Sequence, residues 1–357
     1  MDQILKLLGV ALIFLMTTTG YAAYFNPIND FKQEKKAVIT LGIIWEGQDL
    51  LTHNLQALRD IKKQLRNIPI IQFLNPAYFT KRKAKSDQTS DKIKKVVSKD
   101  DIIGLHLHPW RSFTKKSGVL FRDTPTFWGN KGTDPDQNKE WGHEVPLSIY
   151  TEAEIVRMIN HGKKIFSQNG IKQPEVFMAG GWMAAPHVLA AVRESGILYD
   201  ASAIAIGITK NRLNHFPLYG WLKNIWGSIK PPFQPFSSQT ERGELGQVVL
   251  NGGIPDYNSS KDIVNRFSEM LKSSNSKQNS WLHFQVAIYQ ETAWDTKRSL
   301  LTTIKRLKQY ASKNDVLLNR IEHIRDLFPK ENQPINIKLS SKKFNKKLIN
   351  LDFSLAK

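Results

Sequence analysis

The sequence predicts an α/β protein built as a distorted (β/α)7-like barrel of mainly parallel strands. Apolar runs rich in β-branched residues alternate with segments of helical periodicity, which is typical of parallel sheets. At least six or seven such runs occur, enough for a closed or nearly closed barrel. Polar residues follow several of these runs, as expected where the site of a barrel collects at the carboxyl ends of strands. An open doubly wound sheet is the alternative, but no G-x-G-x-x-G follows the first run.

The first half of the chain supplies three predicted strands. Ala37 to Trp45 is a continuous apolar run that suits a strand buried on both faces. A helix is expected from Leu50 to Arg66, where leucine and isoleucine recur at helical spacing. Ile68 to Leu74 forms the second strand. The third lies in Ile102 to Trp110 and ends at Pro109, because proline cannot donate to a sheet ladder.

The second half repeats the alternation. Thr151 and Glu154 form a T-x-x-E capping box, which predicts the start of a helix. Pro186 marks a further helix start. The stretch from Leu218 to Phe236 is rich in Trp, Pro and Gly and is expected to be irregular. The remaining strands are predicted at Glu175–Gly181, Ile197–Ser202, Gln247–Leu250, Trp281–Tyr289 and Asp315–Ile321.

The most informative pair of residues is His106 and His108. Side chains alternate faces along a strand, so these two imidazoles project to the same side at its carboxyl end. Two neutral imidazoles side by side can share a divalent metal, and two ordinary half-buried histidines are the alternative. Glu46 and Glu291 also follow predicted strands, so both are expected at the same edge.

A long stretch from Arg111 to Tyr150 shows little periodicity and contains several aromatic residues. A loop of this length inside a compact domain is usually functional, often as a lid or a substrate wall.

The ends of the chain are expected to lie outside the barrel domain, which is predicted to span residues 37–328. Residues 1–22 have the features of a signal peptide, because Lys6 precedes an apolar run and the small residues Gly20 and Ala22 favour cleavage. A secreted or periplasmic protein is therefore expected, anchored in the membrane only if this segment stays uncleaved. Residues 330–357 form a basic C-terminal extension.

The composition restricts the possible classes of protein. The absence of cysteine excludes disulfides and thiol nucleophiles. With 51 Lys and Arg against 32 Asp and Glu, the net charge of +19 favours polyanions such as anionic cell-envelope polymers. A simple excess of solvated lysines is the alternative. No nucleic-acid motif accompanies the charge, so nucleic acid is not expected as a partner.

Several motifs resemble the polysaccharide deacetylases, carbohydrate esterases with a distorted α/β barrel. Residues 174–202, PEVFMAGGWMAAPHVLAAVRESGILYDAS, resemble the family's F-R-A-G-G-W segment with the helix and Y-D-S-S-like strand after it. IGLHLHPW resembles its histidine motif in the variant with one intervening residue. IIWEG stands where the family has an aspartate-rich motif, and IYQETA where a late-strand histidine often occurs. The resemblance spans residues 37–328 as dispersed motifs.

The resemblance implies a metal-dependent deacetylase that removes acetyl groups from an acetylated sugar or a cell-envelope polysaccharide. In this family one carboxylate and two histidines hold a divalent metal, with Zn expected first and Ni, Co or Fe as alternatives. Carried over onto this sequence, the ligands are Glu46, His106 and His108. A carboxylate base takes a proton from water, and a histidine acid assists the leaving group.

Three positions depart from the family pattern. Ile43, Ile44 and Trp45 surround the place of the base aspartate, and none of them accepts a proton. Met178 replaces the arginine of F-R-A-G-G-W. Tyr289 stands at the late-strand histidine and would donate a proton only with a strongly lowered pKa. Three carboxylates elsewhere are candidates for the missing base: Asp49, Glu144 and Glu291.

Two further functions stay open. The departures fit a catalytically inactive deacetylase-fold protein that binds glycan. A barrel glycoside hydrolase is the other possibility, and it needs Glu46 and Glu291 to face each other without a metal. If the fold is that of a deacetylase, active or not, four aromatic side chains are expected to stack on sugar rings: Trp110, Trp128, Trp141 and Trp182.

Overall fold

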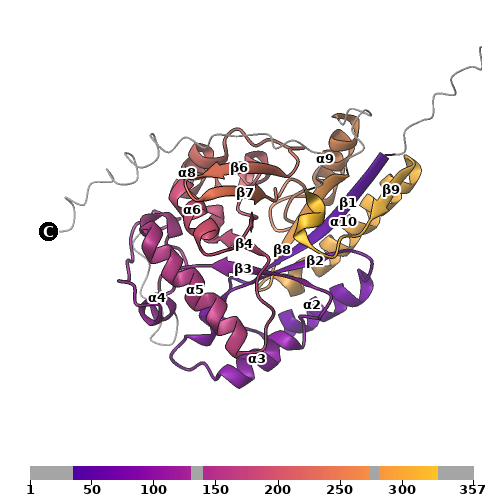
Figure 1. The fold of residues 1–357 in the computed structure, drawn as a ribbon. Coiled ribbons are helices and arrows are strands. Elements are labelled where there is room, and N and C mark those ends of the chain that lie inside the picture. Colours follow the sequence, from indigo (N-terminus) through magenta and orange to yellow (C-terminus); the bar gives the residue numbers. More distant parts are fainter. Residues whose placement is uncertain (1–34, 130–139, 274–280, 329–357) are drawn as a thin grey trace, which may run out of the picture. The chain divides into compact units, whose positions relative to one another are not determined.

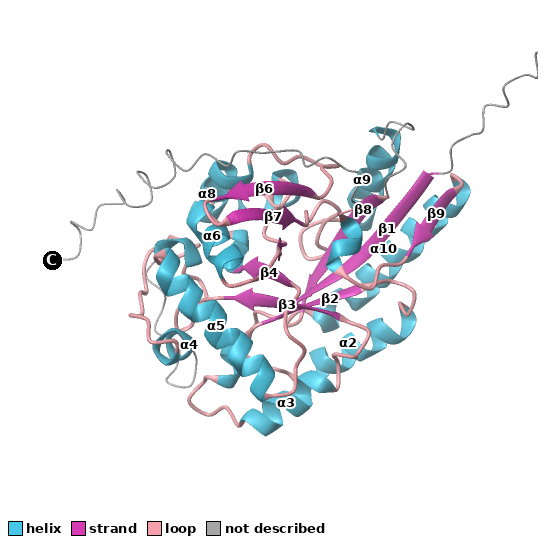
Figure 2. Ribbon diagram, viewed as in Figure 1, coloured by secondary structure: helices cyan, strands magenta, loops and turns pink. Residues whose placement is uncertain are grey.

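Figure 1 shows the computed structural model of the protein, which describes residues 35–129, 140–273 and 281–328. The predicted signal peptide at 1–22 and the basic extension at 330–357 lie outside these residues. Strands run through the centre of the described chain and helices lie around them (Figure 2). The predicted α/β class is confirmed.

Nine strands of the described residues form one sheet. Its order is β6–β7–β5–β4–β3–β2–β1–β8, and β9 pairs with β1. Within this sheet β6 and β7 pair antiparallel and the other pairs are parallel. The strands are β1 (Lys35–Ile44), β2 (Ile70–Leu74), β3 (Ile102–Leu107), β4 (Val176–Ala179), β5 (Tyr199–Asp200), β6 (Phe236–Thr240), β7 (Gly243–Gln247), β8 (Leu282–Tyr289) and β9 (Val316–Asn319).

The sheet curls back on itself through the segment that follows β7. Leu250 bridges to Ile204 beyond β5, and Gly253 bridges to Val286 in β8. The amide of Gly252 donates to the carbonyl of Gln285 at 2.9 Å. This segment therefore links the β5–β7 side of the sheet to β8, which gives the distorted, mainly parallel barrel that the sequence predicts.

Helices cover the outer face of the sheet (Figure 2). The Thr151–Glu154 capping box is present at the start of α5, as predicted. The helices are α2 (Thr52–Gln64), α3 (Ser86–Lys94), α4 (Arg111–Lys116), α5 (Glu152–Gln168), α6 (Pro186–Glu194), α7 (Lys210–Leu213), α8 (Pro217–Trp226), α9 (Ser260–Ser273) and α10 (Ala293–Lys313). Among the described residues, no helix is both long and apolar enough to cross a membrane.

Two glycines make room for an aromatic ring on the inner face of the sheet. A Cβ at Gly104 would lie 2.6 Å from the ring of Phe73, and one at Gly42 would lie 3.1 Å from it. Phe73 pairs with Gly104 across β2 and β3 and is fully buried. Its ring therefore fills the interior one layer below the carboxyl ends of the strands.

One region differs from the sequence prediction. Residues 218–236, expected to be irregular, contain most of helix α8, and the hairpin β6–β7 follows directly. Pro217 occupies the first turn of α8, where its missing N–H has no intrahelical partner to lose. The helix was not expected because the segment is rich in Trp, Pro and Gly and the apolar face of the helix is short. That face is formed by Leu218, Leu222, Ile225 and Trp226.

Candidate metal centre

Three side chains nominated as ligands meet at the carboxyl ends of the central strands. Oε2 of Glu46 lies 3.3 Å from Nε2 of His106 and 3.3 Å from Nε2 of His108. The two imidazole nitrogens are 3.0 Å apart. All three ligand atoms lie within 4.8 Å of one another, which is close enough for one metal ion.

The alternation of side chains along neighbouring strands produces this cluster. His106 lies in β3 and His108 just after it, so their rings share a face and pack edge to face at 4.7 Å between centroids. Glu46 follows β1, which β2 separates from β3. Gly180 follows β4, and a Cβ there would lie 2.6 Å from the His108 ring. The position of His108 therefore requires a glycine at residue 180.

Backbone carbonyls fix the tautomer of both histidines. Nδ1 of His106 lies 3.1 Å from the carbonyl oxygen of Met178, and Nδ1 of His108 bonds the carbonyl oxygen of His143. A carbonyl oxygen only accepts, so each Nδ1 carries the proton and each Nε2 presents a lone pair to the centre. Such partners orient imidazole ligands in metal sites.

The electrostatics of the cluster fit a cation. Burial raises the pKa of Glu46, but hydrogen bonds and charges from His106 and His108 in their protonated forms outweigh it, so the pKa lies well below its usual value and Glu46 stays a carboxylate. Burial lowers the pKa of His106 and favours its neutral form. Two imidazole lone pairs and one carboxylate oxygen thus face one another without a proton to share. A divalent cation satisfies this donor set.

The cluster is open on one side. The side chains of His106 and His108 are 1% and 4% exposed, whereas that of Glu46 is 28% exposed. A small molecule therefore approaches from the side of Glu46.

Of the three candidate bases, Glu291 is the one whose hydrogen bonds connect it to the residue next to Glu46. Its Oε2 accepts a hydrogen bond from the amide of Gly47, the residue after Glu46, at 3.1 Å. Asn54 donates to the carbonyl oxygen of Glu291 at 2.6 Å and so holds its backbone. Burial, followed by the charge of Glu46, raises the pKa of Glu291 to about 8.

The structure places the other two carboxylate candidates away from this arrangement. Asp49 is exposed and forms an ion pair with Lys81 at 3.2 Å, so it faces solvent. Glu144 lies 3.4 Å from Nε2 of His143, which lowers the pKa of Glu144. No described contact joins either carboxylate to Glu46, His106 or His108.

Tyr289 does not have the lowered pKa that a proton donor at this position requires. Burial raises the pKa of Tyr289 well above its usual value, and the charges of Tyr257 and Glu46 raise it further. Its hydroxyl lies 2.9 Å from the hydroxyl of Tyr257. The role of Tyr289 as a general acid stays a prediction that this raised pKa does not favour, and its hydroxyl can serve as a hydrogen-bond donor.

The four tryptophans fall into two groups. Trp110 and Trp182 are 0% and 4% exposed, so neither presents a ring face to a sugar, and the stacking role expected for them is wrong. Trp182 lies next to the tight turn after β4, and its carbonyl accepts from Nε1 of the buried Trp226. Trp128 and Trp141 are partly exposed, and the guanidinium of Arg111 lies over the ring of Trp141 at 5.0 Å.

The departures from the family pattern have structural explanations. Met178 is buried and contributes its carbonyl, not its side chain, to the centre. Ile44 is buried in β1, one layer below Glu46.

Asp200 is also buried, which raises its pKa to about 7, and it accepts hydrogen bonds from both the amide and the hydroxyl of Ser202. Ser202 in turn accepts from the amide of Ala179 at 2.9 Å, which steadies the end of β4.

Local sequence carries no direct signal for four further residues at this end of the sheet. The carbonyls of Met178 and His143 belong to the backbone, so their side chains carry no sign of the role. Gly180 stands out only as part of a motif. Asn75 is followed by Pro76, which is typical of a turn, and its place directly after β2, the strand between β1 and β3, is the available signal.

No family model matches the chain, and no curated protein matches it. Solved structures similar to it include a protein described as a polysaccharide deacetylase from Mycobacterium smegmatis, at 10% identity and a TM-score of 0.47, covering 80% of this chain and 87% of that one. A family 4 carbohydrate esterase from Streptomyces lividans in complex with acetate matches at 10% identity and a TM-score of 0.38, covering 80% and 93%. A family 4 pseudoenzyme from Bacillus anthracis matches at 9% identity and a TM-score of 0.39, covering 81% and 69%.

These structures belong to the family that the sequence motifs resemble, and the chain resembles it as a divergent relative. With every one of these TM-scores below 0.5, the similarities carry no argument about activity. The functional conclusion rests on the geometry of the centre.

Proposed function

We propose that the protein is a metal-dependent hydrolase that removes acetyl groups from an acetylated sugar or cell-envelope polysaccharide. The observation that carries this proposal is the cluster of Glu46, His106 and His108, whose ligand atoms face one another with both Nδ1 atoms held by carbonyls. Glu46 lies against both imidazoles, which favours a metal over the carboxylate pair of a glycoside hydrolase.

Glu46, His106 and His108 would hold the cation, with zinc first and nickel, cobalt or iron as alternatives. When bound there, a divalent cation supplies Lewis-acid chemistry, polarising a carbonyl and lowering the pKa of water. The carbonyl oxygens keep the Nδ1 protons of the two histidines in place, which leaves each Nε2 as the atom that would bind the cation. The open side at Glu46 admits the acetyl group.

Glu291 is proposed as the acid–base group. A pKa near the working pH suits a residue that takes a proton from water and returns it to the leaving group. The pKa of about 8 reflects burial and then the charge of Glu46. A cation next to Glu46 offsets that charge, so metal binding lowers the pKa of Glu291 toward neutrality. The amide of Gly47 holds one oxygen of this carboxyl group in place.

A second candidate function is an inactive protein that binds glycan. Ile44 and Met178 favour it, because both are buried apolar residues where the family has a base and an arginine. Trp128 and Trp141 keep partly exposed rings that suit a sugar in either case.

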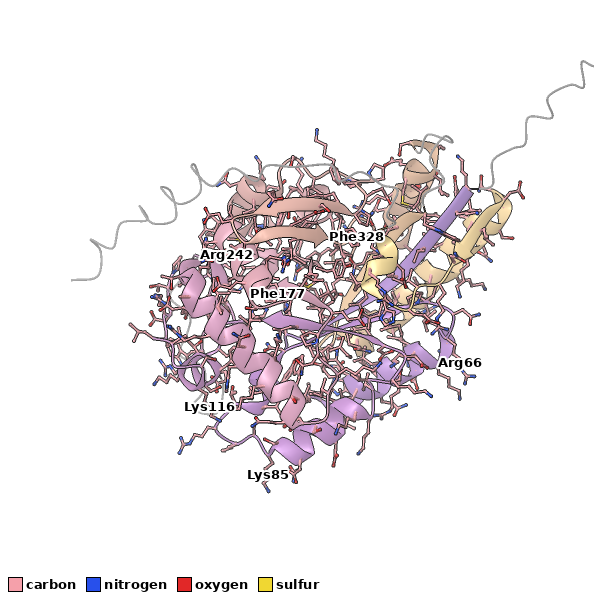
Figure 3. All side chains as sticks on the ribbon, viewed as in Figure 1. Arg66, Lys85, Lys116, Phe177, Arg242 and Phe328 are labelled. Atoms are coloured by element: carbon pink, nitrogen blue, oxygen red, sulfur yellow. The ribbon has the colours of Figure 1, made fainter. Side chains whose placement is uncertain are left out.

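The basic surface supports a polyanionic context for the substrate. Arg66, Lys85 and Lys116 extend outward from the helix-covered surface, whereas Phe177 lies inside the fold (Figure 3). We expect attraction to anionic cell-envelope polymers that weakens with salt, and a secreted or periplasmic location.

Acetate release tests the proposed function. The full chain, loaded in turn with Zn, Ni, Co and Fe, is incubated with acetylated chitin oligosaccharides, acetylated xylan and peptidoglycan fragments. The proposal expects metal-dependent acetate release on at least one substrate and none from a His106→Ala, His108→Ala variant. If the chain binds glycan but releases no acetate with any of the four metals, the second candidate, an inactive glycan-binding protein, would be established instead.

A further inference from the structure

Asn75 occupies a position between two of the ligand strands. It follows β2 directly with extended backbone (φ −94°, ψ 116°) and is 1% exposed. Phe73 pairs with Ile44 across β1 and β2. The Trp45 amide donates to the Phe73 carbonyl at 3.0 Å, so the same pairing continues as far as Trp45. Extended two residues beyond the last pair, this register places Asn75 at the level of Glu46, one strand away.

The register of β2 with β3 gives the same position from the other side. Leu74 pairs with Leu105, so the next residue on each strand places Asn75 beside His106. Asn75 also shares the inner face with Phe73, from which it is two residues away. Extended past the end of β2, the two registers together place Asn75 on the inner face, between Glu46 and His106.

The orientation of the Asn75 amide follows from one hydrogen bond. Its Oδ1 accepts from the backbone amide of Ala77 at 2.9 Å, and only the oxygen can accept from an N–H group. Nδ2 therefore points away from Ala77. This nitrogen is buried and has no hydrogen-bond partner among the described residues. A buried donor without an acceptor is unfavourable, so a bound acceptor is the natural explanation.

We propose that the Asn75 side-chain amide donates a hydrogen bond to the carbonyl oxygen of the acetyl group that is hydrolysed at this centre. This inference rests on the proposed function and adds a residue that orients the substrate. Water adds its oxygen to the acetyl carbon, and the bond from that carbon to the sugar nitrogen or oxygen breaks. One proton from water passes to the leaving group, and the second passes to the amine product or to solvent as acetate departs. Asn75 keeps its protons throughout and stabilises the charge that grows on the carbonyl oxygen.

Two substitutions separate this role from the role of Asn75 in capping the turn after β2. Asn75→Ser and Asn75→Asp both place an efficient capping oxygen at this position, and both remove the amide donor. The serine variant is neutral and the aspartate variant carries a charge, so an effect that both variants share comes from the lost amide donor. We expect kcat to fall about 100-fold to 1,000-fold in both variants, as for loss of one oxyanion donor. Metal content and thermal unfolding midpoint stay close to those of the parent.

A second readout does not depend on turnover. In the ¹⁵N-labelled, metal-loaded parent, the Asn75 side-chain amide resonance is identified by its absence from the Asn75→Ser variant. Titration with acetate, the product of the reaction, is expected to shift this resonance downfield. A resonance that stays in place at saturating acetate overturns the proposal even if the parent shows no turnover.

The kinetic outcomes distinguish the two levels of inference. A parent that releases acetate, with a serine variant within threefold of it, overturns the role of Asn75 and leaves the proposed function intact. A parent that neither releases acetate nor binds it overturns both. Loss of activity together with loss of metal in both variants also overturns the inference, because it assigns Asn75 to metal binding.

Discussion

Buried histidines lie at both ends of the inner face of the barrel, and they differ in what surrounds them. His106 and His108, at the carboxyl end, give their Nδ1 protons to carbonyls and turn Nε2 toward Glu46. His283 is the second residue of β8 and bonds the Thr40 hydroxyl at 2.9 Å through Nε2. Its Nδ1 has no partner among the described residues.

The difference shows that burial alone does not make a histidine a ligand. Burial lowers the pKa of His283 to about 3, and no opposing charge restores it. At the carboxyl end, the carboxylate of Glu46 is partly exposed and two carbonyls select one tautomer. A fixed tautomer, a facing carboxylate and an open side together define a centre, and the opposite end lacks this combination in its described contacts.

The largest expected effect comes from Glu291, which belongs to the carboxyl end. Glu291→Gln removes the proposed acid–base group, so kcat for acetate release is expected to fall about 10²-fold to 10⁴-fold. Asp49→Asn is the matched control, because Asp49 is an exposed carboxylate near Glu46 in sequence and pairs only with Lys81. We expect this control to stay within about twofold of the parent. Equal losses in the two variants, or none in either, would remove Glu291 from the mechanism.

The next effect concerns the packing that holds His108. Gly180→Ala places a Cβ about 2.6 Å from the His108 ring, so the ring must move. Metal affinity is expected to fall roughly 10-fold to 100-fold, the usual effect of disturbing the support of a ligand. Gly220→Ala in α8 is the control, because its added Cβ meets no atom within 4 Å. Competition with a metal chelator measures both affinities, and unchanged affinity in Gly180→Ala would show that the ring is not held by this contact.

The smallest effect tests the other end of the comparison. The folded-state pKa of His283, about 3, lies below the ordinary value of 6.5. As pH falls below 6.5, His283 binds a proton in the unfolded chain but not in the folded chain. Its contribution to the free energy of unfolding therefore drops by about 1.4 kcal/mol per pH unit. This stability is complete above pH 6.5 and is lost on the way down to pH 3.

His283→Gln removes that proton uptake, so its stability is expected to decline less steeply than that of the parent between pH 6.5 and 4.5. Urea unfolding at intervals across this range measures the difference, which reaches about 2–3 kcal/mol. Metal content is expected to stay unchanged in the same variant. Parallel stability curves would mean that His283 is not buried as a neutral imidazole.

Much of the fold was predictable because buried parallel strands leave a simple pattern. The strands predicted at Ala37–Trp45, from Ile102 to Pro109 and at Trp281–Tyr289 became β1, β3 and β8 within one or two residues. Helix α8 and strand β6 were missed, and the strand predicted at Gln247–Leu250 overlaps β7 only at Gln247, since these segments carry no long period. Sequence periodicity does not predict segments whose secondary structure depends more on tertiary packing than on the local pattern.

The centre was predictable in part, for a related reason. The alternation of side chains placed His106 and His108 on one face, and Glu46 ends a neighbouring run. The carbonyls of Met178 and His143 could not be foreseen, because any residue offers a carbonyl and only the fold decides where it points. The burial of Trp110 and Trp182 was likewise a property of packing, not of residue type.

Metal content of the full chain tests the central claim most directly, with elemental analysis after dialysis against trace-metal buffer. The parent and His283→Gln are expected to hold about one divalent metal ion per chain, and a His106→Ala, His108→Ala variant to hold essentially none. No bound metal in the parent after reconstitution with Zn, Ni, Co or Fe would contradict the account. So would equal metal in the parent and the double variant, because the metal would then lie elsewhere.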